Sequence, residues 1–363
     1  MKKIEYFLFA LLVGVVGCTA VTSCDDDDDD YVQSNYERYQ EAVNATVKST
    51  QAASGNKKAI LLVAFGSTWQ QAFDAFDETV DAYEDAYPNY DVYLSFSSAI
   101  CINRASAGTD NAEARNFYDP AHWLTGFASV EYSDIVVQSL QVIPGEEYSR
   151  VVSAVKDFAN NSNGDLDDDY LSEVNLYIGY PLMADSVDDV ENLAEVLDDY
   201  YGSYAENSVV AFMGHGNPDS YDIYGANIRY TQLETAMQKL SPNYFVGTVD
   251  MEDNWKNNVY ERMQEAGITS GTVYCHPLMS IAGDHAHNDM AGDTDAPSSL
   301  DENDEEVSWK CFFSAAGYTC NDDTMILLGL LELPNVRQLW MDHTDDALDR
   351  GAEDLYHSMY SED

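Results

Sequence analysis

The chain has 363 residues, enough for one large domain or two modest ones, each with its own hydrophobic core. Hydrophobic residues make up 45% and aromatic residues 12% of the sequence, which indicates a globular protein and excludes a disordered one. With 65 acidic and 17 basic residues, the net charge is −48. This charge argues against a protein that binds nucleic acid or an anionic membrane surface by electrostatic attraction.

The first 24 residues predict a signal for export. A short basic start precedes an apolar run at residues 7–17, which is too short to span a bilayer. Small residues then lead to Cys18 and Cys24, a pattern that resembles a bacterial lipoprotein signal with a lipid on the cysteine. We favour Cys24, because six aspartates follow it and would form a hydrated spacer, and Cys18 is the alternative. An ordinary cleaved secretory peptide is the other interpretation.

These features predict an exported protein at the outer membrane, in the periplasm or on the cell surface. Its contact with the membrane would be through a lipid anchor alone. Residues 25–56 are expected to form an acidic spacer and a linker with one helix at about residues 34–52. No C-x-x-C pair occurs beyond the signal, so a thiolate zinc site is unsupported. Cys311 and Cys320 could form a disulfide or remain free thiols, and their spacing does not decide.

Strands and helices alternate from residue 57 onward. Residues 69–88 carry apolar side chains at helical spacing, including Phe73, Phe76 and Val80, and Pro88 closes the segment. Short apolar runs predict buried strands at residues 57–67, 90–98, 134–145, 174–183, 208–216, 244–250 and 271–280. Such alternation is typical of parallel sheets covered by helices on both faces.

Two segments begin alike, "ILLVAFGS" and "VVAFMGHG", which indicates a duplicated α/β unit. We therefore predict two similar doubly wound parallel-sheet halves, at residues 57–200 and 201–345, with an acidic C-terminal tail at residues 346–363. Ligands of such sheets bind beyond the carboxyl ends of the strands, so the active-site cleft is expected between the two halves.

Histidines and carboxylates gather at this predicted edge. His215 ends a strand in "FMGHG", Asp250 ends the next one, and "CHPLMSIAGDHAHNDMAGD" supplies His276, His285 and His287. Two histidines and a carboxylate from separate strand ends can hold a divalent transition metal and leave a position open for exchange. Other chemistries lack their motifs, because G-x-S-x-G, G-x-G-x-x-G and H-E-x-x-H are absent.

The order and spacing of several motifs resemble the anaerobic sirohydrochlorin cobaltochelatase family, the single-chain class II chelatases. They are "AILLVAFGS", "IVVQSLQVIPGEEY", "IGYPLM", "FMGHG", "VGTVD", "PLMSIAGDHAHNDMAGD" and "SWKCFFSAAGY". The resemblance covers about residues 57–345 and implies the class II chelatase fold. It implies insertion of Co²⁺ into the tetrapyrrole sirohydrochlorin with release of two protons, in anaerobic cobalamin biosynthesis. Fe²⁺ and Ni²⁺ are alternative substrate metals, and no organic cofactor is indicated.

The resemblance also implies roles for individual residues. His215, Asp250 and His285 would be the metal ligands, and the two histidines would be catalytic. The family usually has Glu where this chain has Asp250, so Glu252 is an alternative. His276 and His287 stand where the family is expected to have apolar residues, and they are candidates for additional metal or haem ligands.

A second hypothesis is a surface haem- or tetrapyrrole-binding lipoprotein on the chelatase fold, acting in scavenging or iron removal. It is favoured by the predicted export and by the negative charge, which would repel the octacarboxylate sirohydrochlorin more than haem. Binding of sirohydrochlorin would need a locally basic cleft, for which the candidates are Arg104, Arg115, Arg150 and Arg229. A third reading, a periplasmic metal-binding protein, leaves most motifs unexplained. The sequence leaves a homo-oligomer open.

Overall fold

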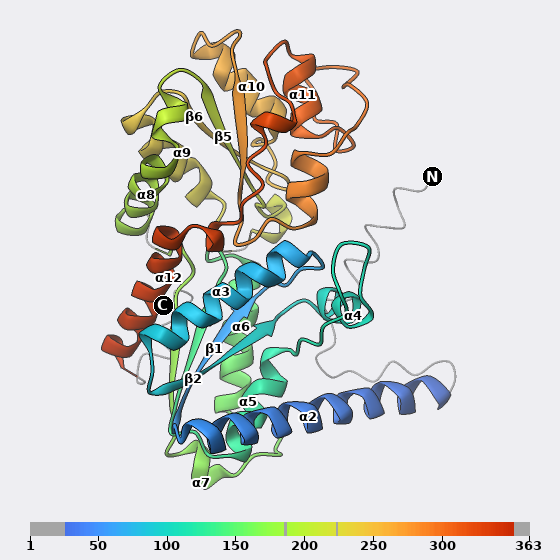
Figure 1. Cartoon of the computed structure of the whole chain (residues 1–363), viewed down its shortest axis with the longest axis vertical. Helices are drawn as coiled ribbons and strands as arrows, with labels where there is room; N and C mark the ends of the chain where they lie inside the picture. The colour runs from blue at the N-terminus through green and yellow to red at the C-terminus, as the bar shows by residue number, and fades with distance from the viewer. Residues whose placement is uncertain (1–25, 185–186, 223, 352–363) are drawn as a thin grey trace.

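Two parallel β-sheets, one above the other in Figure 1, form the framework of the molecule. The computed structural model describes residues 26–184, 187–222 and 224–351. The N-terminal sheet contains β1 (Lys58–Ala64), β2 (Tyr90–Phe96), β3 (Asp134–Ser139) and β4 (Asn175–Gly179). The C-terminal sheet contains β5 (Val209–Gly214), β6 (Tyr244–Thr248) and β7 (Val273–Leu278).

The two sheets repeat one strand order. The N-terminal sheet runs β2-β1-β3-β4 and the C-terminal sheet runs β6-β5-β7, and every neighbouring pair is parallel. In both sheets the first strand is central, the second lies on one side of it and the third on the other. The predicted fold class, two similar α/β halves, is confirmed, and β4 is an addition to the N-terminal half.

Alternating side chains of each strand face opposite helical layers. In the N-terminal half, one face of the sheet packs on α3 (Gln70–Ala86) and α12 (Pro334–Arg350). Its other face packs on α5 (Pro120–Ser129) and α6 (Glu146–Ala159), and α2 (Asp26–Ser54) lies against α5. The shorter α4 (Ala99–Ala107) and α7 (Asp168–Leu171) complete this half.

The C-terminal sheet is covered in the same way. One face packs on α8 (Asp188–Ala205) and α9 (Ile228–Leu240), and the other on α10 (Lys256–Glu265) and α11 (Trp309–Ala315). The single-turn helices are η1 (Asp219–Tyr221), the π-helix η2 (His285–Met290), η3 (Asp322–Thr324) and η4 (Leu330–Glu332). Cys311 and Cys320 are free thiols. Over the described residues, none of the helices has both the length and the apolar character required to cross a membrane.

The division between the halves differs from the predicted one. The predicted boundary at residue 200 falls inside α8, whose buried face packs on α9 and β5 of the C-terminal half. Near the other end, α12 returns to the N-terminal sheet and contacts β3 and β4 (Figure 1). The predicted acidic tail, residues 346–363, therefore starts within α12. The expected spacer and linker at residues 25–56 is helical from Asp26 to Ser54. Residues 352–363 lie outside the described residues.

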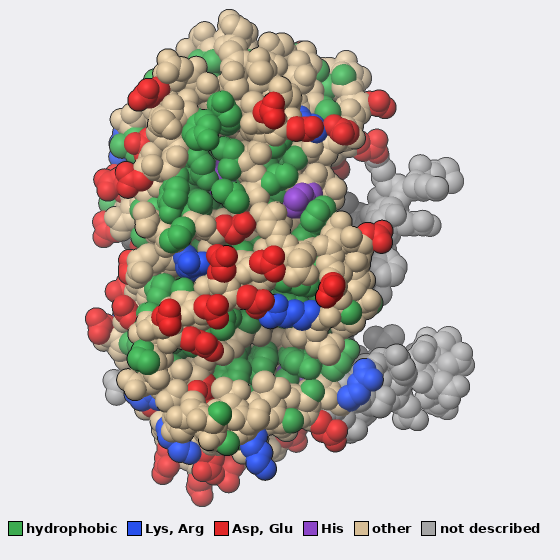
Figure 2. Space-filling view, in the orientation of Figure 1, with side chains coloured by type: hydrophobic (Ala, Val, Ile, Leu, Met, Phe, Trp, Pro, Cys, Tyr) green, Lys and Arg blue, Asp and Glu red, His purple; other side chains and the backbone are tan. Residues whose placement is uncertain are grey.

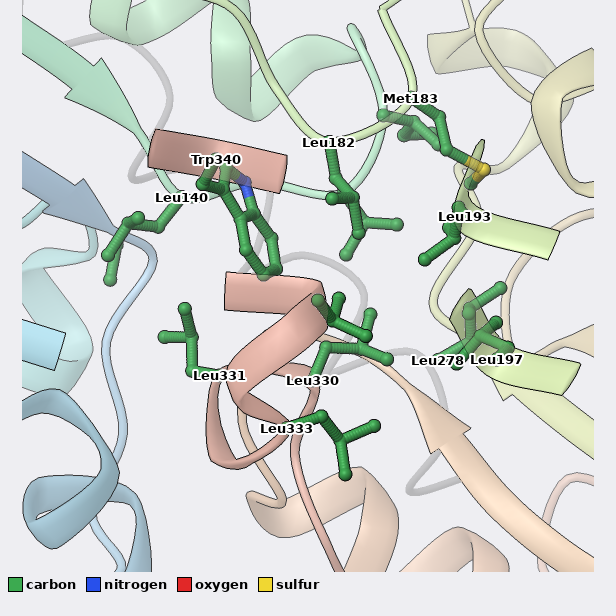
Figure 3. Close-up of a cluster of buried hydrophobic side chains, with 14 of the residues drawn as sticks. Leu140, Leu182, Met183, Leu193, Leu197, Leu278, Leu330, Leu331, Leu333 and Trp340 are labelled. Carbon is green, nitrogen blue, oxygen red and sulfur yellow. The ribbon is translucent and has the colours of Figure 1, made fainter. Parts of the chain in front are cut away.

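A central apolar cluster joins the two halves (Figure 3). The members labelled in Figure 3 come from the segments after β3 and β4, from β7, from α8, and from η4 through α12. They are Leu140, Leu182, Met183, Leu193, Leu197, Leu278, Leu330, Leu331, Leu333 and Trp340. The indole nitrogen of Trp340 also donates a hydrogen bond to the carbonyl oxygen of Gln141 at 3.2 Å. Burial of one such side chain stabilises the fold by roughly 1.5–3 kcal/mol, so this cluster holds the two sheets in one relative position.

Substitution in this cluster should destabilise the whole molecule. Leu331 is fully buried, so Leu331→Ala should lower the free energy of unfolding by about 2–5 kcal/mol, because it removes apolar contacts and leaves a cavity. Leu328, which is 38% exposed, provides a matched control, and Leu328→Ala should cost less than about 1 kcal/mol. Denaturant unfolding of both variants measures the difference. Equal effects would contradict a shared core.

His276 lies in this interior and not at the edge of the sheet. It is fully buried on β7, with its ring 4.9 Å from that of Tyr201 and 5.6 Å from that of Phe212, measured between centroids. Because side chains alternate along a strand, His276 points to the α8 face with Leu278. Desolvation by burial lowers the pKa of its ring to about 3. The prediction that His276 is an additional metal or haem ligand is therefore wrong.

Because His276 is buried in its neutral form, we expect the free energy of unfolding to decrease as the pH falls. Below about pH 6.5 the unfolded chain binds a proton at this residue, which the folded chain does not bind until the pH approaches about 3. Its contribution is therefore complete above about pH 6.5 and is lost as the pH falls toward 3. Between pH 7 and pH 5, wild type should lose about 2 kcal/mol more stability than His276→Phe. Parallel loss in both proteins, measured by denaturant unfolding, would contradict this.

Candidate functional site

A cleft separates the carboxyl edges of the two sheets. It contains about 1120 Å³ of empty space, including the part open to solvent. Its walls are formed by the segments that follow β1, β3, β5 and β7, together with Cys101 and Arg104 of α4. The strand ends of both halves thus meet at one site, as expected for parallel sheets.

His215 lies directly beyond β5 on one wall of this cleft. Its Nδ1–H donates to the carbonyl oxygen of Gly216 at 2.7 Å, so in the neutral ring Nε2 carries the lone pair. Gly216 has φ +75°, and a Cβ on Gly214 would lie 2.3 Å from the ring of Tyr230. The glycines around His215 therefore serve the turn and the packing of Tyr230.

His285 is the first residue of η2 and lies beside His215. Its Nδ1–H donates to Oδ2 of Asp289, one turn further along, at 2.5 Å. Burial favours the neutral ring, but the hydrogen bond to Asp289 and the charges of Asp250 and Asp284 outweigh it, so the pKa of His285 is raised. A carboxylate on Nδ1 fixes the ring and leaves Nε2 for an external ligand, as second-sphere carboxylates do at metal centres.

The two histidines form a pair with one carboxylate nearby. Their rings meet edge to face, with centroids 4.8 Å apart and an interplanar angle of 83°. Oδ2 of Asp250 lies 3.7 Å from Nδ1 of His215. The fold thus brings the two histidines together, and Asp250 approaches His215 from its Nδ1 side. Over the described part of the chain, no three His, Cys, Asp or Glu side chains are yet arranged around a common point.

The remaining candidates lie elsewhere. Glu252 is exposed in the loop after β6. The ring of His287 is stacked on Trp69, with centroids 3.6 Å apart and planes 4° from parallel, so it does not face the histidine pair. Cys18 and Cys24 lie outside the described residues.

Glu147, which sequence reasoning missed, lines the opposite wall of the cleft. It lies in the first turn of α6, directly after the β3 strand end. Desolvation raises the pKa of its carboxyl group, and the nearby His215, Arg150 and His285 only partly offset this. The signal was available in "IPGEEY", because a carboxylate just beyond a parallel strand lies at the ligand-binding edge.

The cleft is not basic. Arg104 is the one lysine or arginine among its lining residues, where Glu146, Glu147 and Asp284 are also present. The other candidate arginines are engaged elsewhere: Arg115 with Asp77 at 2.7 Å, Arg150 with Glu146 at 2.6 Å, and Arg229 with the carbonyl oxygen of Ala184 at 2.9 Å. Figure 2 shows acidic side chains spread over the visible face and few basic ones.

This arrangement suits exchange of a divalent metal ion with a ligand. Neutral imidazole nitrogens bind borderline transition metals, and a carboxylate neutralises part of their charge. The carboxyl group of Glu147 lies across the cleft, and desolvation raises its pKa, which favours uptake of a proton. The open cleft leaves space for a flat molecule between the two walls.

Comparison with known proteins identifies the family of the chain. Residues 58–349 match the family model described as "Cobalt chelatase (CbiK)". The chain is 28% identical over 306 residues to the sirohydrochlorin cobaltochelatase CbiKC of Nitratidesulfovibrio vulgaris, covering 84% of this chain and 95% of that protein. It is 28% identical over 302 residues to the sirohydrochlorin cobaltochelatase of Salmonella typhimurium, covering 82% and 99%.

Among solved structures, SirB from Bacillus subtilis with Fe³⁺ is similar with a TM-score of 0.49 and 15% identity, covering 83% of this chain and 98% of that one. The family match extends over most of the chain and includes both halves of the cleft. It confirms the family and the enzyme class that the motifs predicted. The protein belongs to the cobalt chelatase (CbiK) family of metal chelatases.

Proposed function

We propose that this protein inserts Co²⁺ into sirohydrochlorin as a step of anaerobic cobalamin biosynthesis. The observation that carries the proposal is the His215–His285 pair, held with Nε2 of each ring available on one wall of a cleft whose other wall presents Glu147. The names of the two curated relatives support Co²⁺ as the metal and sirohydrochlorin as the ring. Fe²⁺ and Ni²⁺ remain alternatives for the metal.

In this proposal the C-terminal wall delivers the metal. Hydrated Co²⁺ exchanges water for Nε2 of His215 and His285, and Asp250 supplies negative charge beside His215. Both Nδ1–H groups are already bound to acceptors, so the rings are oriented before the metal arrives. The metal then passes from these ligands to the ring nitrogens, and water refills its former positions.

The N-terminal wall receives the protons. Insertion of a dication into a neutral macrocycle releases two pyrrole protons, so the net charge is conserved. Glu147 faces the histidine pair, and desolvation raises the pKa of its carboxyl group, which makes its carboxylate a better proton acceptor. Its carboxylate takes up one proton at a time and passes it to solvent through the open side of the cleft.

A second candidate function is binding of haem or another tetrapyrrole by an exported lipoprotein, for scavenging or iron removal. The specific observation in its favour is the scarcity of basic side chains in the cleft, where Arg104 is the one lysine or arginine among the described residues of the lining. An octacarboxylate ring would meet more repulsion there than a dicarboxylate such as haem. We also propose export with a lipid on Cys24 or Cys18, on the basis of the N-terminal sequence.

One spectral experiment distinguishes the two functions. With Co²⁺ and sirohydrochlorin, the wild-type protein should form cobalt-sirohydrochlorin over many turnovers. His215→Ala and His285→Ala should each lower the rate more than about 100-fold, since loss of a direct ligand exceeds the roughly 10–100-fold effect of losing an orienting residue. Asp250→Asn should also slow insertion, and the matched Glu252→Gln should leave the rate near wild type.

The same proteins are then titrated with haem alone. A stoichiometric shift of the haem Soret band, together with no turnover of Co²⁺ and sirohydrochlorin, would contradict the chelatase and support the tetrapyrrole-binding function. Wild-type insertion rates in both histidine variants would overturn the assignment of the site.

The assignment of Glu147 as proton acceptor predicts a separable defect. Glu147→Gln should lower kcat by about 100-fold or more, because a general base contributes roughly that factor. Binding of Co²⁺ should remain near wild type, since Glu147 is not a metal ligand in this proposal. Glu84, whose pKa is also raised by burial, lies on α3 away from the cleft, and Glu84→Gln is the matched control. An unchanged kcat in Glu147→Gln would contradict the role.

A further inference from the structure

A contact between Trp69 and η2 spans the two halves beside the histidine pair. Trp69 directly precedes α3 of the N-terminal half, and η2 carries His285 of the C-terminal half. The indole Nε1–H donates to Oδ1 of Asp284 at 2.5 Å, although the two residues are 215 positions apart. Asp284 is the residue before His285 and lines the cleft.

The carboxylate of Asp284 accepts this hydrogen bond from Trp69 and does not cap its own helix, η2. It occupies the N-cap position of η2, where an aspartate side chain usually accepts a hydrogen bond from the backbone of the next turn. No such cap bond is made, and the carboxylate is directed to Trp69 instead. The start of η2 is therefore held from across the cleft and not by its own cap. A π-helical turn is rare and weakly stabilised by itself, so external contacts decide its position.

His287 adds a second contact to the same indole. Its ring stacks on Trp69 with centroids 3.6 Å apart, and its Nε2 is buried with no hydrogen-bond partner in the described part of the chain. Trp69 therefore touches the residues on both sides of His285, at positions 284 and 287.

Trp69 itself is firmly placed. Its backbone N–H donates to Oγ of Ser67 at 3.2 Å. Two residues later, Nε2 of Gln71 donates to the carbonyl oxygen of Leu327 at 2.6 Å and to Oε1 of Glu332 at 2.9 Å. These hydrogen bonds connect the start of α3 to the segment that leads into α12. They therefore fix the position of Trp69 relative to η2.

We propose that Trp69 is a positioning residue for metal binding, which holds η2 through Asp284 and His287 so that His285 stands against His215. This inference rests on the proposed role of His285 as a metal ligand. It makes the metal site of the C-terminal half depend on a side chain of the N-terminal half. A change in the separation of the two walls would then be transmitted directly to a ligand of the metal.

The test measures Co²⁺ binding by the full chain without tetrapyrrole, through the visible d–d absorption of the bound ion. Trp69→Phe keeps an aromatic face for His287 and removes the bond to Asp284. Its dissociation constant for Co²⁺ should rise about tenfold or more, as when other ligand-orienting residues are lost. Trp123→Phe is the matched control, because Trp123 packs on Tyr93 behind the N-terminal sheet, and its affinity should equal that of wild type.

A double-mutant cycle separates positioning from a general loss of structure. Asp284→Ala should weaken Co²⁺ binding as Trp69→Phe does, and the double variant should be no weaker than either single one, because both remove one interaction. Wild-type affinity and spectrum in Trp69→Phe, or additive effects in the cycle, would overturn the inference.

His285→Ala is measured alongside. If His285→Ala loses Co²⁺ binding while Trp69→Phe binds Co²⁺ like wild type, the positioning role of Trp69 is rejected and the ligand role of His285 stands. Wild-type Co²⁺ binding by His285→Ala would reject the ligand assignment on which the proposed function rests.

Discussion

Apolar packing between the two sheets is the constraint on which the rest of the molecule depends. The segment after β4 and the segment before α12 bring Leu182 and Leu331 into one buried cluster with side chains of both sheets (Figure 3). Because this packing is dense and non-polar, it fixes the separation of the sheets to within the tolerance of van der Waals contact. The cleft, which lies between the two carboxyl edges, takes its width from that separation.

The two walls of the cleft have different chemistry because their polar groups are held differently. On the C-terminal wall, each histidine uses Nδ1 for an internal hydrogen bond and keeps Nε2 for a ligand. On the N-terminal wall, desolvation raises the pKa of Glu147, and the charges of His215, Arg150 and His285 only partly offset it. In the proposed function, the C-terminal wall binds the metal and the N-terminal wall accepts the protons, which is what exchange of a metal ion for two protons requires. The scarcity of basic side chains in its lining distinguishes this cleft from one built to attract a highly charged anionic ring.

Much of the fold could be predicted because the strands are short, apolar and bounded by turns. All seven predicted strands are present, and the repeated order around β1 and β5 matches the similarity of their sequences. The division between the halves was misplaced, since α8 follows β4 in sequence but packs on β5. The return of α12 to the N-terminal sheet was also missed. Local sequence patterns describe which face of a helix is apolar but not which sheet that face will meet.

The sequence alone determined the residue types at the carboxyl edge of each strand, and hence that His215, Asp250 and His285 would meet at one site. It did so because parallel strands all end at the same edge. Only the tertiary structure decided which neighbouring histidines would join them. Because side chains alternate along β7, His276 points into the core. The ring of His287 stacks on Trp69, which is 218 positions away along the chain. The motif "IPGEEY" could have placed Glu147 at the carboxyl edge of its sheet, but only the packing of the two halves showed that it lies across the cleft from the histidine pair, because such long-range contacts leave no periodic trace in the sequence.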